Sequence, residues 1–208
     1  PRLSQLETLT HAFANRAGEV SVIVQAKQGD LSVSVNAQRP LPSASLIKAA
    51  IACTAADLAA NAKLDLSQTV PRGELDETFY CSILHAFEPE DALSLKSLIG
   101  LMLLVSDNPA TSAVLDRVGL NAVNAWLAAQ GLLGSNLEAG FDAASLGAPL
   151  RANLTTAEDC LKLLKLIDQS PRYGFIKRML ANNLRNDRIP KRLPDDAVIA
   201  HKTGTLNG

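Results

Sequence analysis

The sequence has few aromatic residues, few cysteines and no long hydrophobic run. Aromatic residues make up 4% of its 208 residues, so the core must be built from Leu, Ala, Val and Ile. The three cysteines, Cys53, Cys81 and Cys160, are too few and too widely spaced for a disulfide framework or a zinc site. No apolar run reaches the roughly 18 residues that a membrane-spanning helix needs. We therefore expect no disulfide scaffold, no metal site and no membrane span.

An excess of charge of either sign is also missing. The formal net charge is −1, with 20 basic and 21 acidic residues, so nothing favours nucleic acid or an anionic membrane as a partner. No phosphate-binding loop or dinucleotide fingerprint occurs, and we expect no cofactor. No signal peptide is visible, but the chain starts at Pro1 without Met, so a leader could already have been removed.

Hydrophobic periodicity predicts a hairpin, then many helices, then a strand. Residues 19–26 and 31–37 alternate at period two around the turn residues 27–30, which is typical of a β-hairpin. Capping-box spacings, Ser4 with Glu7 and Thr155 with Glu158, predict two helix starts. Residues 135–153 form a patternless loop, a length that is often functional. The other predicted helices begin near 44 and cover about 93–105, 108–119, 121–131 and 173–184, and the predicted final strand covers 197–206.

This order predicts an α/β fold in which an antiparallel sheet packs with helices beside a mainly helical lobe. We expect a single domain over 1–208, with an α/β lobe from about 1–43 and 171–208 and a helical lobe from about 44–170. Asn207-Gly208 favours a hairpin turn, yet no second strand follows it. We therefore expect an incomplete domain whose remaining strands and helix lie beyond this sequence, and a split sheet without them.

The first of three short motifs is Ser45-Leu46-Ile47-Lys48. Positions i and i+3 of a helix share a face, so the Lys48 amine can reach the Ser45 hydroxyl near a helix N-terminus. A neutral lysine could act as the base, which burial or a second nearby cation would favour. Taken alone, the motif also fits a helix start with a solvated lysine, although the flanking sequence is strongly apolar.

The second motif is Ser106-Asp107-Asn108, followed by Pro109. Alone it fits a turn and the N-cap of the next helix. In a functional reading Ser106 supplies a proton-shuttling hydroxyl, Asn108 an amide for a substrate carbonyl, and Asp107 holds the turn.

The third motif is Lys202-Thr203-Gly204-Thr205. A lysine on an edge strand is often a solubility device, but glycine within a strand often marks the approach of a ligand. The succession of a lysine, a hydroxyl and a glycine could seat an anionic group.

Together, in this order and spacing, the three motifs are those that class A β-lactamases and penicillin-binding proteins share. The sequence resembles class A β-lactamase-like serine hydrolases along nearly its whole length, including "LLVSDNPATSAVLDRVG" and "VIAHKTGTLNG". The resemblance implies that Ser45 is the acylated nucleophile and Lys48 its base or proton relay. Ser106 would pass the proton to the leaving nitrogen. Asn108 would bind the substrate amide, Lys202 and Thr203 its carboxylate, and the N–H groups of Thr205 and Ser45 its oxyanion, with Gly204 in the same binding strand.

The sequence departs from this family in the long loop. The position expected for the glutamate that activates the deacylating water falls at Phe141, with Asp142 beside it and Glu138 three residues earlier. The usual loop ion pair is also lost, since Ala139 and Ala152 lie near its positions. A positioned general base contributes about 10²–10⁴-fold, so we expect acylation to survive and deacylation to slow.

The resemblance implies a small-molecule substrate, which could be a β-lactam, a peptide or an ester. The alternatives are a D-alanyl-D-alanine peptidase or esterase of the penicillin-binding type, and a covalent β-lactam binder or sensor without turnover. It also implies a periplasmic or secreted protein, monomeric once the C-terminal segment is present. Of the other reactive residues, His201 is expected to be structural, and Tyr80 or Cys81 could line the cleft.

Overall fold

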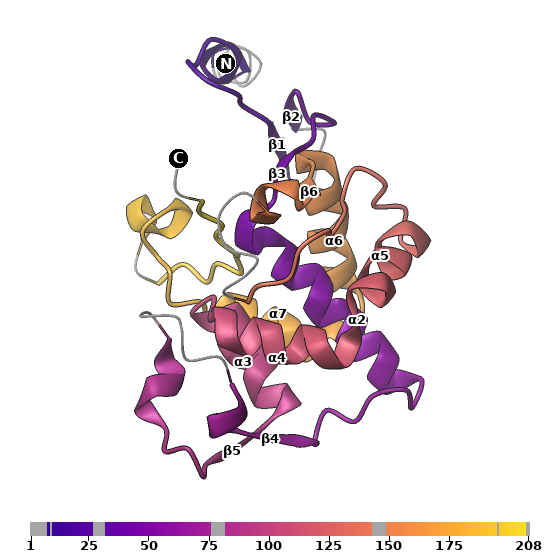
Figure 1. Ribbon diagram of the computed structural model, residues 1–208. Coiled ribbons are helices and arrows are strands. Elements are labelled where there is room, and N and C mark those ends of the chain that lie inside the picture. The colour runs from indigo at the N-terminus through magenta and orange to yellow at the C-terminus, as the bar shows by residue number, and fades with distance from the viewer. Residues whose placement is uncertain are drawn as a thin grey trace.

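The computed structural model describes residues 8, 10–26, 32–75, 82–142, 149–194 and 196–206. The Ser4–Glu7 cap, Tyr80, Cys81 and the Asn207-Gly208 turn lie outside these residues. Figure 1 shows helix α2 running through the middle of the remaining helices, with the N-terminal hairpin at one end. Residues 10–14 are helical, within the helix predicted to begin near Ser4. The labelled α-helices are α2 (Lys48–Ala60), α3 (Leu95–Leu104), α4 (Asn108–Val118), α5 (Leu120–Ala129), α6 (Ala157–Gln169) and α7 (Gly174–Ala181).

Helix α2 is the centre of the core because its sequence is apolar on every side. Such a helix must be covered all round to remove its surface from water. All residues from Lys48 to Ala56 are buried, and α3, α4, α5, α6 and α7 all contact the helix. The predicted long buried helix from about residue 44 is confirmed, except that Ala44–Ile47 form a 3₁₀ turn, η1, before α2 begins.

Side-chain caps set several helix boundaries. Ser94 and Asp107 accept N–H bonds at the starts of α3 and α4. Thr156 caps α6 by accepting from Asp159 N at 3.0 Å, so the predicted cap at Thr155 is wrong by one residue. The Thr155 hydroxyl lies 2.8 Å from Ser135 Oγ instead, in a tertiary contact that the local pattern did not contain.

The described strands form three separate two-stranded antiparallel ladders. Strands β1 (Val22–Gln25) and β2 (Ser32–Val35) form the predicted hairpin, with Val22 opposite Val35. The other ladders are short: β3 (Leu41–Pro42) pairs with β6 (Leu154–Thr155), and β4 (Thr69–Pro71) with β5 (Ala92–Ser94). The short 3₁₀ segments are η2 (Arg72–Glu74), η3 (Ile83–Ala86), η5 (Pro149–Ala152), η6 (Pro171–Tyr173) and η7 (Ile189–Arg192).

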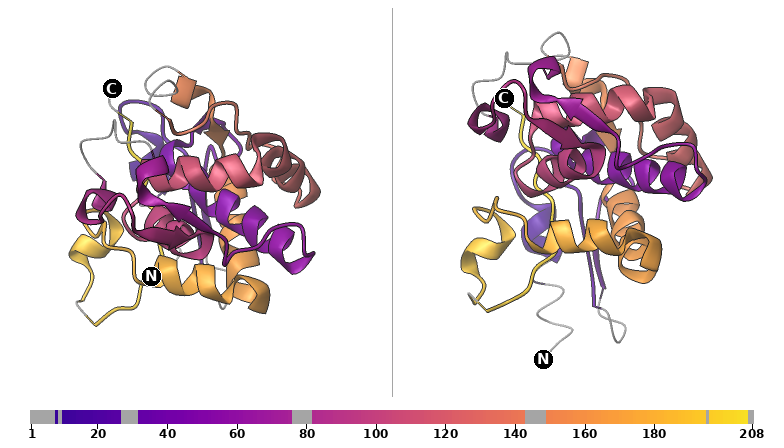
Figure 2. Two further views of the ribbon diagram at one scale, coloured as in Figure 1. Left: turned by 60° about the horizontal axis from the view of Figure 1, so that its bottom comes forward. Right: turned by 90° about the horizontal axis from the view of Figure 1, so that it is seen from below.

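The predicted final strand at 197–206 is wrong for the described residues, because none of residues 197–206 pairs in a ladder. Strand geometry depends on a neighbouring strand, and the hairpin does not provide one for this segment. Figure 2 shows the yellow C-terminal segment beside the helices and apart from the hairpin. The sheet is split, as expected from the sequence.

A search of the described residues finds no helix with the length and hydropathy to cross a bilayer. Among the same residues, no group of three or more His, Cys, Asp or Glu side chains could hold a metal ion.

Candidate active site

Ser45 lies in the 3₁₀ turn η1, one turn before Lys48. The preceding residue, Ala44, has a φ of 46°, a left-handed conformation that is costly for a residue with a Cβ. Ser43 N donates to Asn153 O at 2.7 Å and holds this turn in place. Ser45 is half-buried in this turn, which leads into the long helix α2.

Lys48 is completely buried, and its amine is directed toward the second motif. Nζ donates to Ser106 O at 2.8 Å and to Asn108 Oδ1 at 2.6 Å, and it lies 3.3 Å from Ser106 Oγ. Burial, helped by the charge of Lys202 and opposed by Asp107, holds the pKa of Lys48 well below its ordinary value. No hydrogen bond among the described residues joins Lys48 to Ser45, so the expected direct contact is absent from this conformation.

The second motif forms the turn between α3 and α4. Ser106 has a φ of 63°, which places its carbonyl and its hydroxyl on the side of Lys48. Asp107 Oδ1 accepts from Ala110 N at 2.9 Å, and Oδ2 accepts from Ser82 Oγ at 2.6 Å. The prediction that Asp107 holds the turn is therefore confirmed.

Lys202 approaches the same hydroxyl from the C-terminal segment. Its Nζ donates to Ser106 Oγ at 2.9 Å and to Thr203 O at 2.8 Å. Burial and the charge of Arg185 lower the pKa of Lys202 to about 7. Ser106 Oγ thus lies within hydrogen-bond distance of two amines whose pKa values are both depressed, an arrangement that can pass a proton in either direction.

Gly204 brings the third motif against the turn that carries Ser45. A Cβ at Gly204 would lie 3.1 Å from Ala44 Cβ, 3.1 Å from Ser43 O and 3.2 Å from Leu46 Cγ. Only a residue without a side chain allows this close approach without adjustment. Thr203 takes part through its carbonyl, whereas the exposed Thr205 accepts a bond from Arg188 at 3.3 Å.

Phe141 covers Lys48 from the long loop. The ring is buried, and its centroid lies 4.7 Å from Lys48 Nζ. Glu138 accepts a bond from Asn136 at 2.7 Å, and Asp142 is exposed. The aromatic ring therefore lies beside the lysine at the position where the sequence comparison expected a carboxylate.

Sequence reasoning missed Asn153, which fixes the loop to the catalytic turn. Asn153 is fully buried; its Oδ1 accepts from Glu138 N and Ala139 N, and its Nδ2 donates to Ala139 O. Its own carbonyl accepts the Ser43 bond described above. The available signal was an asparagine next to the β6 residues at the end of a long loop, because buried amides often organise such loops.

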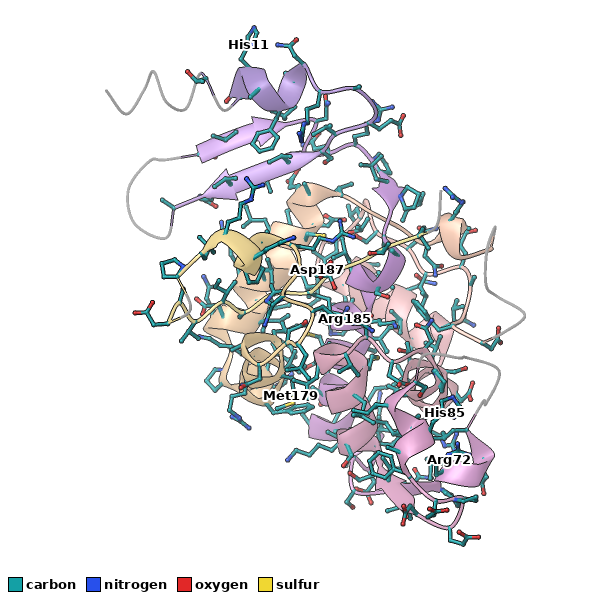
Figure 3. The ribbon with its side chains drawn as sticks, turned by 90° about the vertical axis from the view of Figure 1, so that its left-hand side faces the viewer. His11, Arg72, His85, Met179, Arg185 and Asp187 are labelled. Carbon is teal, nitrogen blue, oxygen red and sulfur yellow. The ribbon has the colours of Figure 1, made fainter. Side chains whose placement is uncertain are left out.

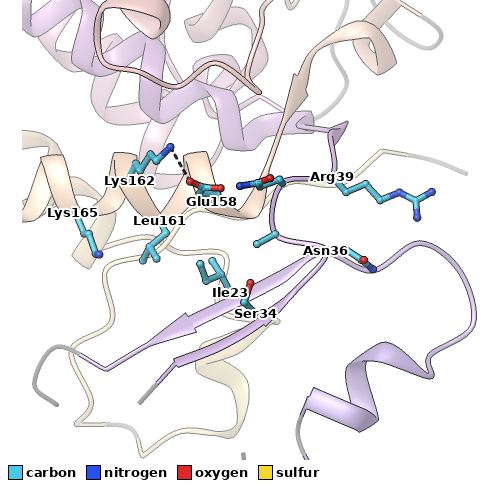
Figure 4. Close-up of a pocket in the computed structure, with 10 residues that line it drawn as sticks. Ile23, Ser34, Asn36, Arg39, Glu158, Leu161, Lys162 and Lys165 are labelled. Carbon is cyan, nitrogen blue, oxygen red and sulfur yellow. Dashed lines mark ion pairs between the residues drawn. The ribbon is translucent and has the colours of Figure 1, made fainter. Parts of the chain in front are cut away.

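A cavity of about 610 Å³ lies elsewhere, between the β1–β2 hairpin and α6 (Figure 4). Its polar residues include Arg39, Lys165 and the ion pair of Lys162 with Glu158 at 3.0 Å. None of the predicted site residues lines it, so the candidate site rests on hydrogen bonds and packing rather than on this cavity.

The chain matches one protein family over nearly its whole length. The Beta-lactamase2 family, described as a β-lactamase enzyme family, matches residues 4–208. No curated protein matches the chain.

Three of the similar solved structures illustrate the fold. A β-lactamase from Chitinophaga pinensis DSM 2588 superposes with a TM-score of 0.85 at 22% identity, covering 99% of this chain and 79% of that one. TLA-3 extended-spectrum β-lactamase superposes with a TM-score of 0.85 at 19% identity, covering 98% of this chain and 78% of that one. A leucine-to-glutamate mutant of PBP-A, in an acyl-enzyme complex with penicillin G, superposes with a TM-score of 0.82 at 21% identity. The match covers 98% of this chain and 78% of that one. About a fifth of each structure has no counterpart in these 208 residues.

Proposed function

The chain belongs to the β-lactamase enzyme family, and from this premise we propose that it is a serine hydrolase acylated on Ser45 by β-lactams or related amides and esters. The observation that carries the proposal is the convergence of Lys48 and Lys202 on the Ser106 hydroxyl, next to the turn of Ser45. Lysines whose pKa values are strongly lowered by burial and a specific neighbouring charge are concentrated at functional sites.

The proposed acylation transfers one proton and exchanges one bond. Ser45 Oγ attacks the substrate carbonyl and loses its proton to neutral Lys48, directly after a small movement of the amine or through a bound water. The carbonyl–nitrogen bond then breaks, and the leaving nitrogen takes a proton that Ser106 Oγ supplies from Lys48 or Lys202. Asn108 and the Thr203–Thr205 segment would bind the substrate amide and carboxylate.

Phe141 supports a further part of the proposal, slow deacylation. Hydrolysis of the ester on Ser45 needs an activated water, and a buried aromatic ring lies against Lys48 where a general base is expected. A covalent β-lactam binder is therefore the second candidate function, favoured by this ring alone.

The deciding experiment follows a fluorescent penicillin on the protein in its full natural length. Covalent label that appears within minutes and decays within hours, together with cephalosporin cleavage, supports a β-lactamase. Label that persists, with no cleavage of any substrate, supports the binder. Persistent label together with cleavage of a D-alanyl-D-alanine peptide supports the peptidase of the penicillin-binding type, and cleavage of an ester without label supports the esterase. Undiminished labelling of Ser45→Ala would show that the nucleophile is misassigned.

Phe141→Glu tests the origin of slow deacylation. If the missing carboxylate limits turnover, this variant should release the label faster, by up to about 10²-fold, without a matching gain in acylation. Phe141→Leu is the matched control, since it shortens the apolar side chain and adds no base. Equal release rates for both variants would contradict the role given to position 141.

A further inference from the structure

The C-terminal end of α3 is bonded in an unusual way. A helix leaves its last four carbonyls without partners inside the helix. Here Leu103 O accepts from Asn183 Nδ2 at 2.7 Å, Leu104 O from Leu184 N at 2.9 Å and Val105 O from Arg185 Nε at 3.2 Å. Three successive residues thus satisfy three successive carbonyls immediately before Ser106.

Arg185 is also bonded to the segment that carries Lys202. Its carbonyl lies 3.3 Å from His201 Nε2, and His201 N donates to Leu180 O at 3.1 Å. Asn183 fixes the backbone of Arg185 relative to α3. Its Oδ1 accepts from Arg185 N at 2.8 Å, and its Nδ2 donates to Leu103 O of α3. Asn183 is buried, whereas Arg185 is exposed.

We propose that Arg185 is a positioning residue of the site, which joins the Ser106 turn to the His201–Lys202 segment. Figure 3 shows Arg185 where the C-terminal segment passes the pink helices. Residues 197–206 pair in no ladder, so no sheet fixes the position of Lys202. The contacts of Arg185 and His201 hold this segment instead, and they keep Lys202 Nζ beside Ser106 Oγ. The inference rests on the proposed function and adds to it a residue outside the three motifs.

Electrostatics agrees with this geometry. The charged groups that act on the pKa of Lys48 are Lys202, Asp107 at the start of α4 and Arg185, and Arg185 also acts on the pKa of Lys202. In the same C-terminal segment, Arg188 donates to Thr205 Oγ1 at 3.3 Å. The charge of Arg185 lowers the pKa of Lys202, where it acts beside burial, and it also lowers that of Lys48. Arg185 therefore favours a neutral Lys48 at neutral pH.

The test uses Arg185→Gln, which keeps a hydrogen-bond donor and removes the charge. Arg192→Gln is the matched control, since Arg192 is exposed on η7, in the same C-terminal segment. Two quantities are measured on the full natural chain. The first is the ¹³C NMR titration of the lysine Cε carbons, in which the Lys202 signal is assigned by its disappearance in Lys202→Arg. The second is the pH profile of the rate of labelling by fluorescent penicillin.

With Arg185→Gln, both lysine titrations and both limbs of the labelling profile should move to higher pH, and labelling at pH 6 should fall about two- to fivefold. Arg192→Gln should leave the titrations and the profile in place. An unmoved Lys202 titration in Arg185→Gln would overturn the inference, whether or not the protein is labelled. Absence of label on the wild type, with moved titrations, would refute the proposed function and leave the role of Arg185 intact.

Discussion

The helical half of the site and its C-terminal half are built in different ways. Lys48 lies on α2, completely buried, and the half-buried Ser106 lies in the turn between α3 and α4, which pack against α2 in the core. Residues 182–206, the C-terminal segment, are largely exposed, and none of the described ones pairs in a ladder. The comparison shows that one side of the site is formed by buried helices and the turn that joins them, whereas the other side is a segment without a strand partner, held by separate side-chain and backbone hydrogen bonds.

The largest effect should come from the helical half. Lys48→Met removes the buried amine and its bonds to Ser106 and Asn108 while nearly preserving the volume of the side chain. We expect acylation to fall about 10²–10⁴-fold, the usual contribution of a general base. Stopped-flow labelling with a fluorescent penicillin measures this rate.

Lys63→Met is the matched control for this substitution, because Lys63 is exposed just after α2. It should label at the wild-type rate. A Lys48→Met rate within threefold of wild type would remove Lys48 from the proposed mechanism.

The two halves also differ in how much could be predicted from the sequence. Helices α2 to α7 were predicted because periodicity and caps are local, and the burial of Lys48 was indicated by its apolar neighbours. The hydrogen-bond partners of Lys48 could not be predicted in this way, because the direction of a long side chain depends on which groups the fold brings near it. Asn153 and Arg185 were missed for the same reason, because their bonds join segments far apart in the sequence.

The next largest effect should be on stability, and it compares the same chemical change in both halves. Leu98 on α3 is completely buried, whereas Leu184 in the C-terminal segment is 67% exposed. Leu98→Ala should lower the free energy of unfolding by about 2–5 kcal/mol, through lost transfer energy and a cavity. Leu184→Ala should change it by less than about 0.5 kcal/mol.

Urea unfolding followed by circular dichroism measures both stability changes. A loss of more than about 1.5 kcal/mol for Leu184→Ala would mean that the C-terminal segment is packed more firmly than its exposure indicates.

A smaller effect concerns pH. The pKa of Lys202 is lowered to about 7, so the amine is charged below that pH and neutral above it. If Lys202 binds the substrate carboxylate in its charged form, affinity should fall about tenfold between pH 6 and pH 8, following the protonated fraction. A penicillin whose carboxylate is methylated should lose this dependence. Equal pH profiles for acid and ester would show that the charge of Lys202 does not serve carboxylate binding.

The smallest effect should come from Gly204→Ala, which tests how firmly the C-terminal segment is held. The new Cβ would lie 3.1–3.2 Å from Ala44 Cβ, Ser43 O and Leu46 Cγ, so the neighbours must move by a few tenths of an ångström. The residues on the helical side are held in place, because Ser43 is bonded to Asn153 and α2 is buried. The C-terminal segment can move instead, because no ladder fixes it. Labelling should therefore slow by about fivefold or less, which corresponds to an increase of about 1 kcal/mol in the activation free energy. A loss of more than 100-fold would mean that the segment is held as rigidly as a strand in a complete sheet.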